Sequence, residues 1–242
     1  MPAEVRDLAG SAVIVTGASS GIGAATAALL HERGARVLLT ARRGDRLKEL
    51  AAKLGTAYVA GDIADPATGR ELVARAVSEF GRLDSIVLNA GVGRYGGITD
   101  GDDAEMAEII RTNLDGTVWA VRAAVQEFRR AQDGGDIVIV ASVAGLRGGG
   151  NEAVYAATKF AQVGLAGSLD REVREDGIRV TTIAPAAVRT EFAIGRGRTD
   201  GDPALDQMLR PEDVGYAIAT VLAQPRRVRT TLWTMYSMSE GS

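Results

Sequence analysis

The feature that most constrains the fold is a repeated alternation of short, continuously apolar runs with longer segments of helical periodicity. Continuously apolar runs are typical of strands in a parallel sheet, because helices cover both faces of such a sheet. Repeated strand–helix units favour a doubly wound, Rossmann-like architecture with right-handed crossovers. We therefore predict a single α/β domain over residues 1–242, with a seven-stranded parallel sheet flanked by helices. The predicted strands span 12–16, 36–40, 57–61, 85–89, 136–142, 178–184 and 230–236.

The segments between these runs carry helix signals of their own. Leu72, Ala76 and Phe80 belong to one apolar stripe at helical period. Two long helical segments cover roughly 103–131 and 152–175. Residues 193–206 are rich in Gly and Asp and offer little apolar area for anchoring. We expect a mobile substrate loop there, at about 190–210, rather than a linker between domains.

Composition excludes several classes of function. The chain has no cysteine, so a disulfide framework, a thiolate nucleophile and a cysteine-based metal site are all impossible. Its single histidine, His31, argues against a histidine-dependent triad and a multi-histidine zinc site, and we expect no metal. The formal net charge is −3 and there is no dominant basic block, which argues against nucleic-acid and membrane-surface partners. No apolar run approaches the ~20 residues of a membrane span and no signal pattern is present, so we expect a cytoplasmic protein.

A glycine-rich turn follows the first predicted strand. The sequence Thr16–Gly23 reads TGASSGIG and opens a predicted helix. Glycine in such a turn lets the backbone approach a pyrophosphate, and the helix start directs N–H groups at it. The alternative is a tight turn that only needs small residues. The position of the turn between strand and helix favours a dinucleotide site.

The end of the second predicted strand indicates which dinucleotide binds. An acidic residue there takes the ribose hydroxyls of NAD, whereas a basic residue accommodates the 2′-phosphate of NADP. Ala41 holds the position where an Asp is expected, and Arg42 follows it. A guanidinium can bind a phosphate through a planar fork, so we predict NADP(H). The alternative is that Arg42 and Arg43 simply lead into the next helix.

Residues 155–159 read YAATK, with a tyrosine and a lysine four positions apart. On a helix this spacing places both side chains on one face, with Cβ atoms roughly 5–6 Å apart. Such pairs also arise by chance on helix surfaces. Since histidine and cysteine are nearly or wholly absent, any acid–base chemistry must come from carboxylates, lysine or tyrosine.

Taken together, these motifs resemble the short-chain dehydrogenase/reductase family, of the single-domain, NADP-preferring type. The resemblance covers nearly the whole chain, and its motifs occur in the expected order. They are Thr16–Gly23, Asp62, Asn89–Gly91, Asn113, Ser142 and Tyr155 with Lys159.

The resemblance implies a catalytic role for four residues. Tyr155 would act as general acid in reduction and as general base in oxidation, with Ser142 holding the substrate oxygen. The Lys159 ammonium and a positive nicotinamide are expected to lower the pKa of Tyr155. Asn113 would bend its long helix and hold a water in a proton relay. The catalytic set is Asn113, Ser142, Tyr155 and Lys159.

The resemblance also implies a set of cofactor contacts. Asp62 would contact the adenine amino group, and Val188 and Thr190 would contact the nicotinamide amide. The family usually has Pro-Gly after the sixth strand, but here the pair is Pro185-Ala186, and the turn beside the nicotinamide is expected to differ. The full cofactor set is Gly17, Ser19, Ser20, Gly21, Ile22, Gly23, Arg42, Asp62, Ile63, Asn89, Ala90, Gly91, Tyr155, Lys159, Pro185, Val188 and Thr190.

The sequence says less about substrate and assembly. Arg94 and Arg147 could meet an anionic substrate group, or they could be solvated. The resemblance implies a homodimer or homotetramer formed through the long helices at 103–131 and 152–175. Trp119, Val121 and Val125 could pack against a partner there or against the protein's own sheet. The substrate pocket is expected from Val92, Gly93, Arg94, Tyr95, 143–147, Val154 and 186–206.

We therefore expect an NADP(H)-dependent oxidoreductase that interconverts a small ketone or aldehyde with an alcohol by hydride transfer. Two alternatives use the same fold. The first is a non-catalytic NADP-binding regulator, and the second is an isomerase, dehydratase or decarboxylating relative. Net consumption of reduced cofactor would separate the proposed reaction from both.

Overall fold

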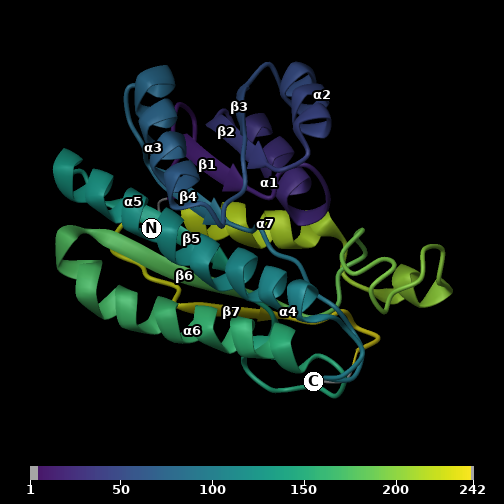
Figure 1. The fold of residues 1–242 in the computed structure, drawn as a ribbon. Coiled ribbons are helices and arrows are strands. Elements are labelled where there is room, and N and C mark those ends of the chain that lie inside the picture. The colour runs from purple at the N-terminus through teal and green to yellow at the C-terminus, as the bar shows by residue number, and fades with distance from the viewer. Residues whose placement is uncertain (1–4, 241–242) are drawn as a thin grey trace.

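The computed structural model describes residues 5–240 and contains one parallel seven-stranded sheet (Figure 1). The strand order β3-β2-β1-β4-β5-β6-β7 confirms the doubly wound architecture predicted from the sequence. The chain moves outward from β1 to β3 and then crosses back to β4. This reversal beside β1 is where open α/β sheets bind ligands, at the carboxyl ends of the strands. The strands are β1 Ala12–Thr16, β2 Arg36–Ala41, β3 Ala57–Ala60, β4 Ser85–Leu88, β5 Gly135–Val140, β6 Ile178–Pro185 and β7 Leu232–Met235.

Helices cover both faces of the sheet, and each face has its own apolar core. One core joins α1, α2 and α7 to the sheet, and the other joins α3, α5 and α6 to it. Val121 and Val125 lie in the second core, so these two residues are buried against the protein's own sheet. The helices are α1 Gly21–Glu32, α2 Gly44–Leu54, α3 Pro66–Phe80, α4 Asp103–Ile110, α5 Gly116–Ala131, α6 Ala153–Val173 and α7 Pro211–Leu222.

The long helical segment expected at 103–131 is interrupted. A π-helical turn at Arg111–Asp115 separates α4 from α5, and it contains Asn113. Such a turn widens the helix, and π-bulges of this kind are frequent at functional sites. The interruption brings Asn113 to the carboxyl end of the sheet instead of leaving it within a regular helix.

The segment between β6 and α7 projects beyond the carboxyl ends of the strands (Figure 1). It contains isolated bridges from Val188 to Leu209 and from Ile194 to Arg198, and a short 3₁₀ helix at Pro203–Gln207. Ala193 adopts a positive φ of 60° within it. This part of the chain therefore has local structure, although little of it is buried in the two main cores.

Within residues 5–240, no helix is both long and apolar enough to cross a membrane. The same residues contain no group of three or more His, Cys, Asp or Glu side chains arranged to hold a metal ion.

Candidate active site

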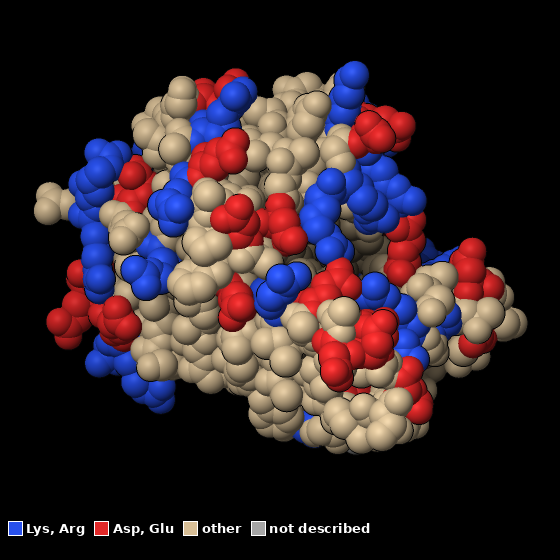
Figure 2. Space-filling view, viewed as in Figure 1, with Lys and Arg blue, Asp and Glu red and all other residues tan. Residues whose placement is uncertain are grey.

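A cavity of about 810 Å³ opens at the carboxyl ends of the central strands. The ends of β1, β2, β4, β5 and β6 line it together with α6 and the segment between β6 and α7. Figure 2 shows basic and acidic side chains gathered where the surface is hollowed. All proposed cofactor and catalytic residues line this cavity except Gly23 and Asn113, which lie just behind its wall.

The glycine turn forms one end of the cavity. Gly17 and Gly21 have positive φ values of 67° and 54°, which L side chains rarely adopt. A Cβ on Gly17 would lie 2.8 Å from Cα of Ala90, and a Cβ on Gly23 would clash with the carbonyl of Gly17. Ser20 precedes α1 without capping it through its side chain. The first N–H groups of α1 are therefore available to an anion, which is what a pyrophosphate requires.

Asn89 joins the glycine turn to the end of β4. Its Nδ2 donates to the carbonyl of Thr16 at 3.0 Å. The hydroxyl of Thr16 in turn accepts from the main-chain N–H groups of Asn89 and Ala90, each at 3.0 Å. These bonds fix the separation of β1 and β4 at the point where the sheet order reverses.

Two arginines stand at the end of β2, and both are paired. Arg42 Nη1 lies 2.6 Å from Glu108 Oε1 and the side chain is half exposed. Its hydrogen bond is the largest cause of a lowered pKa at Glu108. Arg43 donates from Nε to Ser19 Oγ at 3.0 Å, from Nη2 to Ser20 Oγ, and from Nη1 to Glu191 Oε2 at 2.8 Å.

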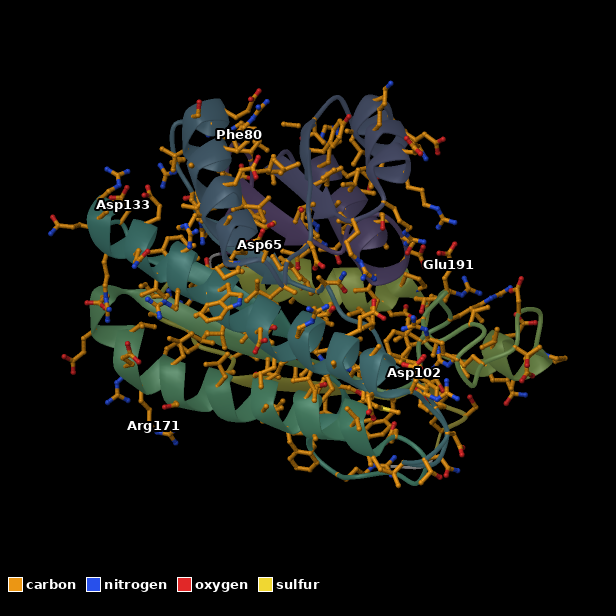
Figure 3. All side chains as sticks on the ribbon, viewed as in Figure 1. Asp65, Phe80, Asp102, Asp133, Arg171 and Glu191 are labelled. Carbon is orange, nitrogen blue, oxygen red and sulfur yellow. The ribbon has the colours of Figure 1, made fainter. Side chains whose placement is uncertain are left out.

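Arg43 is thus a site residue that the sequence interpretation left out. It connects the two serines of the glycine turn to Glu191, which lies on the segment between β6 and α7 (Figure 3). The signal that could have identified it was its place beside Arg42 at the strand end. Two adjacent guanidinium groups at this position provide more donors for a phosphate than one does.

Asn113 is fully buried, and its side chain is completely hydrogen-bonded. Nδ2 donates to Val92 O at 2.9 Å and to Thr158 Oγ1 at 3.0 Å, while Oδ1 accepts from Val92 N at 2.9 Å. Its main-chain carbonyl accepts from Thr117 Oγ1 at 2.6 Å and from Gln162 Nε2 at 2.8 Å. Protein donors therefore use both acceptor positions of the Asn113 main-chain carbonyl. This carbonyl is not open to the relay water that the resemblance implies.

Tyr155 and Lys159 lie on one face of α6, as their spacing predicts. Lys159 Nζ is 5.5 Å from the centroid of the Tyr155 ring. It donates to Val140 O at 3.0 Å and to Gln162 Oε1 at 2.9 Å. Burial lowers the pKa of Lys159 to about 7, because the cavity wall offers the ammonium little solvation.

The sequence predicts a lowered pKa for Tyr155, but the protein's own groups raise it. Burial raises the pKa of Tyr155, and the neighbouring Tyr95 adds to the rise, while Ser142 and Arg198 oppose it. The physical reason is that moving a phenolate out of water costs more than these neighbours return. The raised pKa favours the protonated phenol, the form that a general acid must have before it acts.

Ser142 follows β5 and is buried beside this pair. Its Oγ accepts from Ala144 N at 3.1 Å and makes a long contact of 3.4 Å as donor to Pro185 O. At Pro185-Ala186 the turn keeps ordinary geometry, since Ala186 is not among the positive-φ residues and its N–H donates to Met235 O at 2.8 Å. The alanine therefore introduces no backbone strain at this turn.

The far end of the cavity is aromatic. The Phe192 ring lies 5.3 Å from that of Tyr155 and 6.3 Å from that of Tyr95, centroid to centroid. Gly93 lies under Phe192, and a Cβ on it would clash with Phe192 Cζ. The Arg198 guanidinium stacks 5.3 Å from the centroid of the Tyr95 ring. The sequence analysis did not single out Phe192 or Arg198, although both lie within the range 186–206 that was expected to line the substrate pocket.

Most of the remaining predicted residues lie at the cavity, but Arg94 does not line it. Arg94 is paired with Glu105 at 2.9 Å and donates to Asp100 O, so it is committed to a structural ion pair instead of an open anion site. Arg147 is exposed at the rim of the cavity. Asp62, which follows β3, accepts from Ala64 N at 3.0 Å. Asp62, Ile63, Val188 and Thr190 all line the cavity.

Comparison with known proteins agrees with this geometry. The sequence matches the short chain dehydrogenase family over residues 11–200. An uncharacterised oxidoreductase of Staphylococcus aureus (strain MRSA252) is 34% identical over 218 residues, which cover 89% of this chain and 92% of the relative. The closed form of a serine dehydrogenase complexed with NADP+ has a TM-score of 0.88 at 28% identity, covering 95% of this chain and 96% of its own. An alcohol dehydrogenase from the archaeon Thermococcus sibiricus, complexed with 5-hydroxy-NADP, has a TM-score of 0.85 at 26% identity, covering 96% and 98%.

Proposed function

Because this chain belongs to the short-chain dehydrogenase family, we propose that it is an NADP(H)-dependent oxidoreductase that interconverts a ketone or aldehyde with the corresponding alcohol. The observation that carries the proposal is that Tyr155 and Lys159 line the same cavity as the glycine turn. A proton donor and a dinucleotide cradle in one cavity are the two parts that carbonyl reduction needs.

The preference for NADP(H) rests on the charge at the end of β2. Arg42 and Arg43 line the cavity there, and no acidic residue occupies the position of Ala41. Their carboxylate partners are Glu108, which is mostly buried, and Glu191, which is exposed, and a 2′-phosphate can replace either as acceptor. The two solved relatives described above were both bound to NADP-type cofactors, which supports the same preference.

The protein's own residues would manage the substrate oxygen and its proton. Bound nicotinamide, when reduced, supplies the hydride that the carbonyl carbon receives. Ser142 Oγ would donate a hydrogen bond to the carbonyl oxygen as negative charge develops on it. Tyr155 would transfer its proton to that oxygen, which leaves a phenolate. The Lys159 ammonium would stabilise this phenolate, and in alcohol oxidation each transfer runs in reverse.

Two alternatives remain distinct from this reaction. A non-catalytic regulator would bind NADP(H) through the glycine turn without turnover. An isomerase or dehydratase would convert its substrate with no net change in the cofactor. The buried Tyr155–Lys159 pair favours the oxidoreductase, because a binding protein has no need of a desolvated ammonium beside a phenol.

The deciding experiment measures oxidation of NADPH and NADH against a panel of ketones and aldehydes, with products identified by mass spectrometry. The proposal predicts alcohol formation in equal amount to NADPH consumed, and slower reaction with NADH. Tight NADPH binding without turnover across the panel would favour the regulator. Product formation without cofactor consumption would favour the isomerase or dehydratase.

We also infer that the protein forms a homodimer or homotetramer. Ile110 on α4 and Phe160 on α6 are 45% and 46% exposed, and both lie on the helices that cover one face of the sheet. Large apolar side chains this exposed are suited to an interface between copies. Sedimentation velocity of the wild type and of the Ile110→Asp, Phe160→Asp double variant would test it, with dissociation of the variant as the expected result.

A further inference from the structure

Gln162 on α6 connects the lysine of the cavity to the π-helical turn. It is 1% exposed, and each of its amide atoms has protein partners. Nε2 donates to Asn113 O and to Thr117 Oγ1, each at 2.8 Å, and Oε1 accepts from Lys159 Nζ at 2.9 Å. No part of the sequence interpretation assigned it a role, because an isolated glutamine in a helix carries no chemical signature.

The network fixes the orientation of the Gln162 amide. A lysine ammonium can only donate, so the amide oxygen must face Lys159. The carbonyl of Asn113 can only accept, so the amide nitrogen must face the π-helical turn. Thr117 Oγ1 donates to that same carbonyl at 2.6 Å, which leaves its lone pairs for Gln162. The donors and acceptors of the group are satisfied in one arrangement.

Gln162 supplies one of two protein acceptors for the Lys159 ammonium. The other is Val140 O, at 3.0 Å, and no carboxylate pairs with Lys159 among the described residues. Burial lowers its pKa, and its hydrogen-bond partners on β5 and α6 are both uncharged. The titratable group that faces it is Tyr155, on its own helix. Two hydrogen bonds on the protein side leave the third N–H available toward the cavity.

We propose that Gln162 is a positioning residue for Lys159. Its amide oxygen stabilises the charged ammonium and directs it toward the cavity, while its amide nitrogen occupies an acceptor position of the Asn113 carbonyl. The importance of the contact between Gln162 and Lys159 for catalysis rests on the proposed function. An amide neither gains nor loses a proton at neutral pH, so the bridge holds the lysine without conducting a proton. Protons that pass through Lys159 therefore move on its cavity side, and Asn113 O is not their next acceptor.

The chain provides an unusually clean test, because it contains only three lysines, Lys48, Lys53 and Lys159. Lys48 and Lys53 are exposed. In protein labelled with ¹³C at lysine Cε, the NMR titration of Lys159 is read beside these two internal references. The Gln162→Met variant removes the acceptor with little change in size, and Gln162→Glu replaces it with a carboxylate of the same shape.

The proposal predicts shifts of opposite sign. The midpoint for Lys159 falls in Gln162→Met and rises in Gln162→Glu, each by about one pH unit, the effect of one hydrogen bond to a charged group. Lys48 and Lys53 titrate as before. Unchanged midpoints, or shifts of the same sign in both variants, would overturn the proposal. The isosteric Gln162→Glu keeps the test available if Gln162→Met folds poorly.

Thr117→Val is the matched control, since it removes one of the two acceptors of the Gln162 amide nitrogen and leaves the contact with Lys159 in place. Its Lys159 midpoint is expected to stay within a few tenths of a unit of the wild type. A shift as large as that of Gln162→Met would mean that general packing, not the acceptor, sets the lysine charge, and would overturn the assignment. The titration needs no turnover, so loss of the proposed oxidoreductase activity and failure of this inference give separate results.

Discussion

The two walls of the cavity are held in different ways. On one side, Asn113, Lys159 and Gln162 are at most 4% exposed and are joined by hydrogen bonds without a carboxylate. On the other side, the segment between β6 and α7 is held largely by ion pairs: Glu191 meets Arg43 and Arg46, each within 2.8 Å, and Arg196 meets Glu105 and Glu108.

This difference has a physical consequence. Buried hydrogen bonds in a closely packed wall fix side chains to within fractions of an ångström, because leaving any partner unmatched is costly. Partly exposed ion pairs are worth only about 0–1 kcal/mol each and weaken with salt. We therefore propose that the proton chemistry lies on the wall held by buried hydrogen bonds, and that the substrate enters past the segment held by ion pairs.

The largest effect is expected at the buried wall. Lys159→Met removes the ammonium that would stabilise the Tyr155 phenolate, and carbonyl reduction should fall by about 10²–10⁴, the range for positioned acid–base groups. The wild-type rate should fall as pH rises through about 7, because Lys159 is charged below its pKa and neutral above it. That descending limb should be missing in Lys159→Met. Steady-state kcat/KM across pH measures both effects, and a limb that survives in the variant would assign it to another group.

The cofactor end tests whether exposed ion pairs can be exchanged for a ligand. In Arg42→Ala, a 2′-phosphate loses one charge-assisted partner, and the Kd of NADPH should rise by about 10- to 100-fold while that of NADH hardly changes. Fluorescence titration with both cofactors measures the ratio. Arg130→Ala is the control, because Arg130 has a comparable exposed pair with Glu127 away from the cavity. Equal loss for NADPH and NADH would remove the basis for the cofactor preference.

The contact between the walls is tested at Gly93, which lies under the ring of Phe192. A Cβ in Gly93→Ala would clash with Phe192 and lie 3.0 Å from Tyr155 Cδ2, so the ring must move. We expect KM for the carbonyl substrate to change by about tenfold, while the melting temperature changes little, because the segment that holds Phe192 is expected to yield. Gly148→Ala serves as control, since a Cβ there meets nothing within 4 Å. A large loss of stability would show that the segment holding Phe192 is as rigid as the opposite wall.

The smallest effect is expected at Glu191 itself. Glu191→Gln weakens the pairs to Arg43 and Arg46, and kcat/KM should change by only about two- to five-fold, the value of an exposed pair. The dependence of the wild-type rate on ionic strength should also become shallower in the variant. Kinetics at low and high salt measure this, with Glu127→Gln as the distant control. A hundredfold loss would mean that this wall is fixed as firmly as the other.

The same division explains what the sequence could predict. Tyr155 and Lys159 were placed correctly because their meeting depends only on helical spacing. The parallel, doubly wound sheet was predicted correctly from the repeated apolar runs. Gln162 was missed because its meaning depends on Asn113, 49 positions away, and Arg43 because its partner Glu191 lies 148 positions away. Among the protein's own groups the pKa of Tyr155 is raised, because burial sets its direction and depends on packing that no local pattern encodes.

The proposed transfer of the Tyr155 proton to the substrate oxygen can be measured in a single turnover. Stopped-flow absorbance follows a single turnover of bound NADPH with a carbonyl substrate in the wild type and in Tyr155→Phe, which keeps the ring that packs against Phe192. If Tyr155 is the proton donor, NADPH oxidation should be about 10²–10⁴ slower in the variant, with the Kd of NADPH unchanged. Equal rates in the two proteins would contradict it.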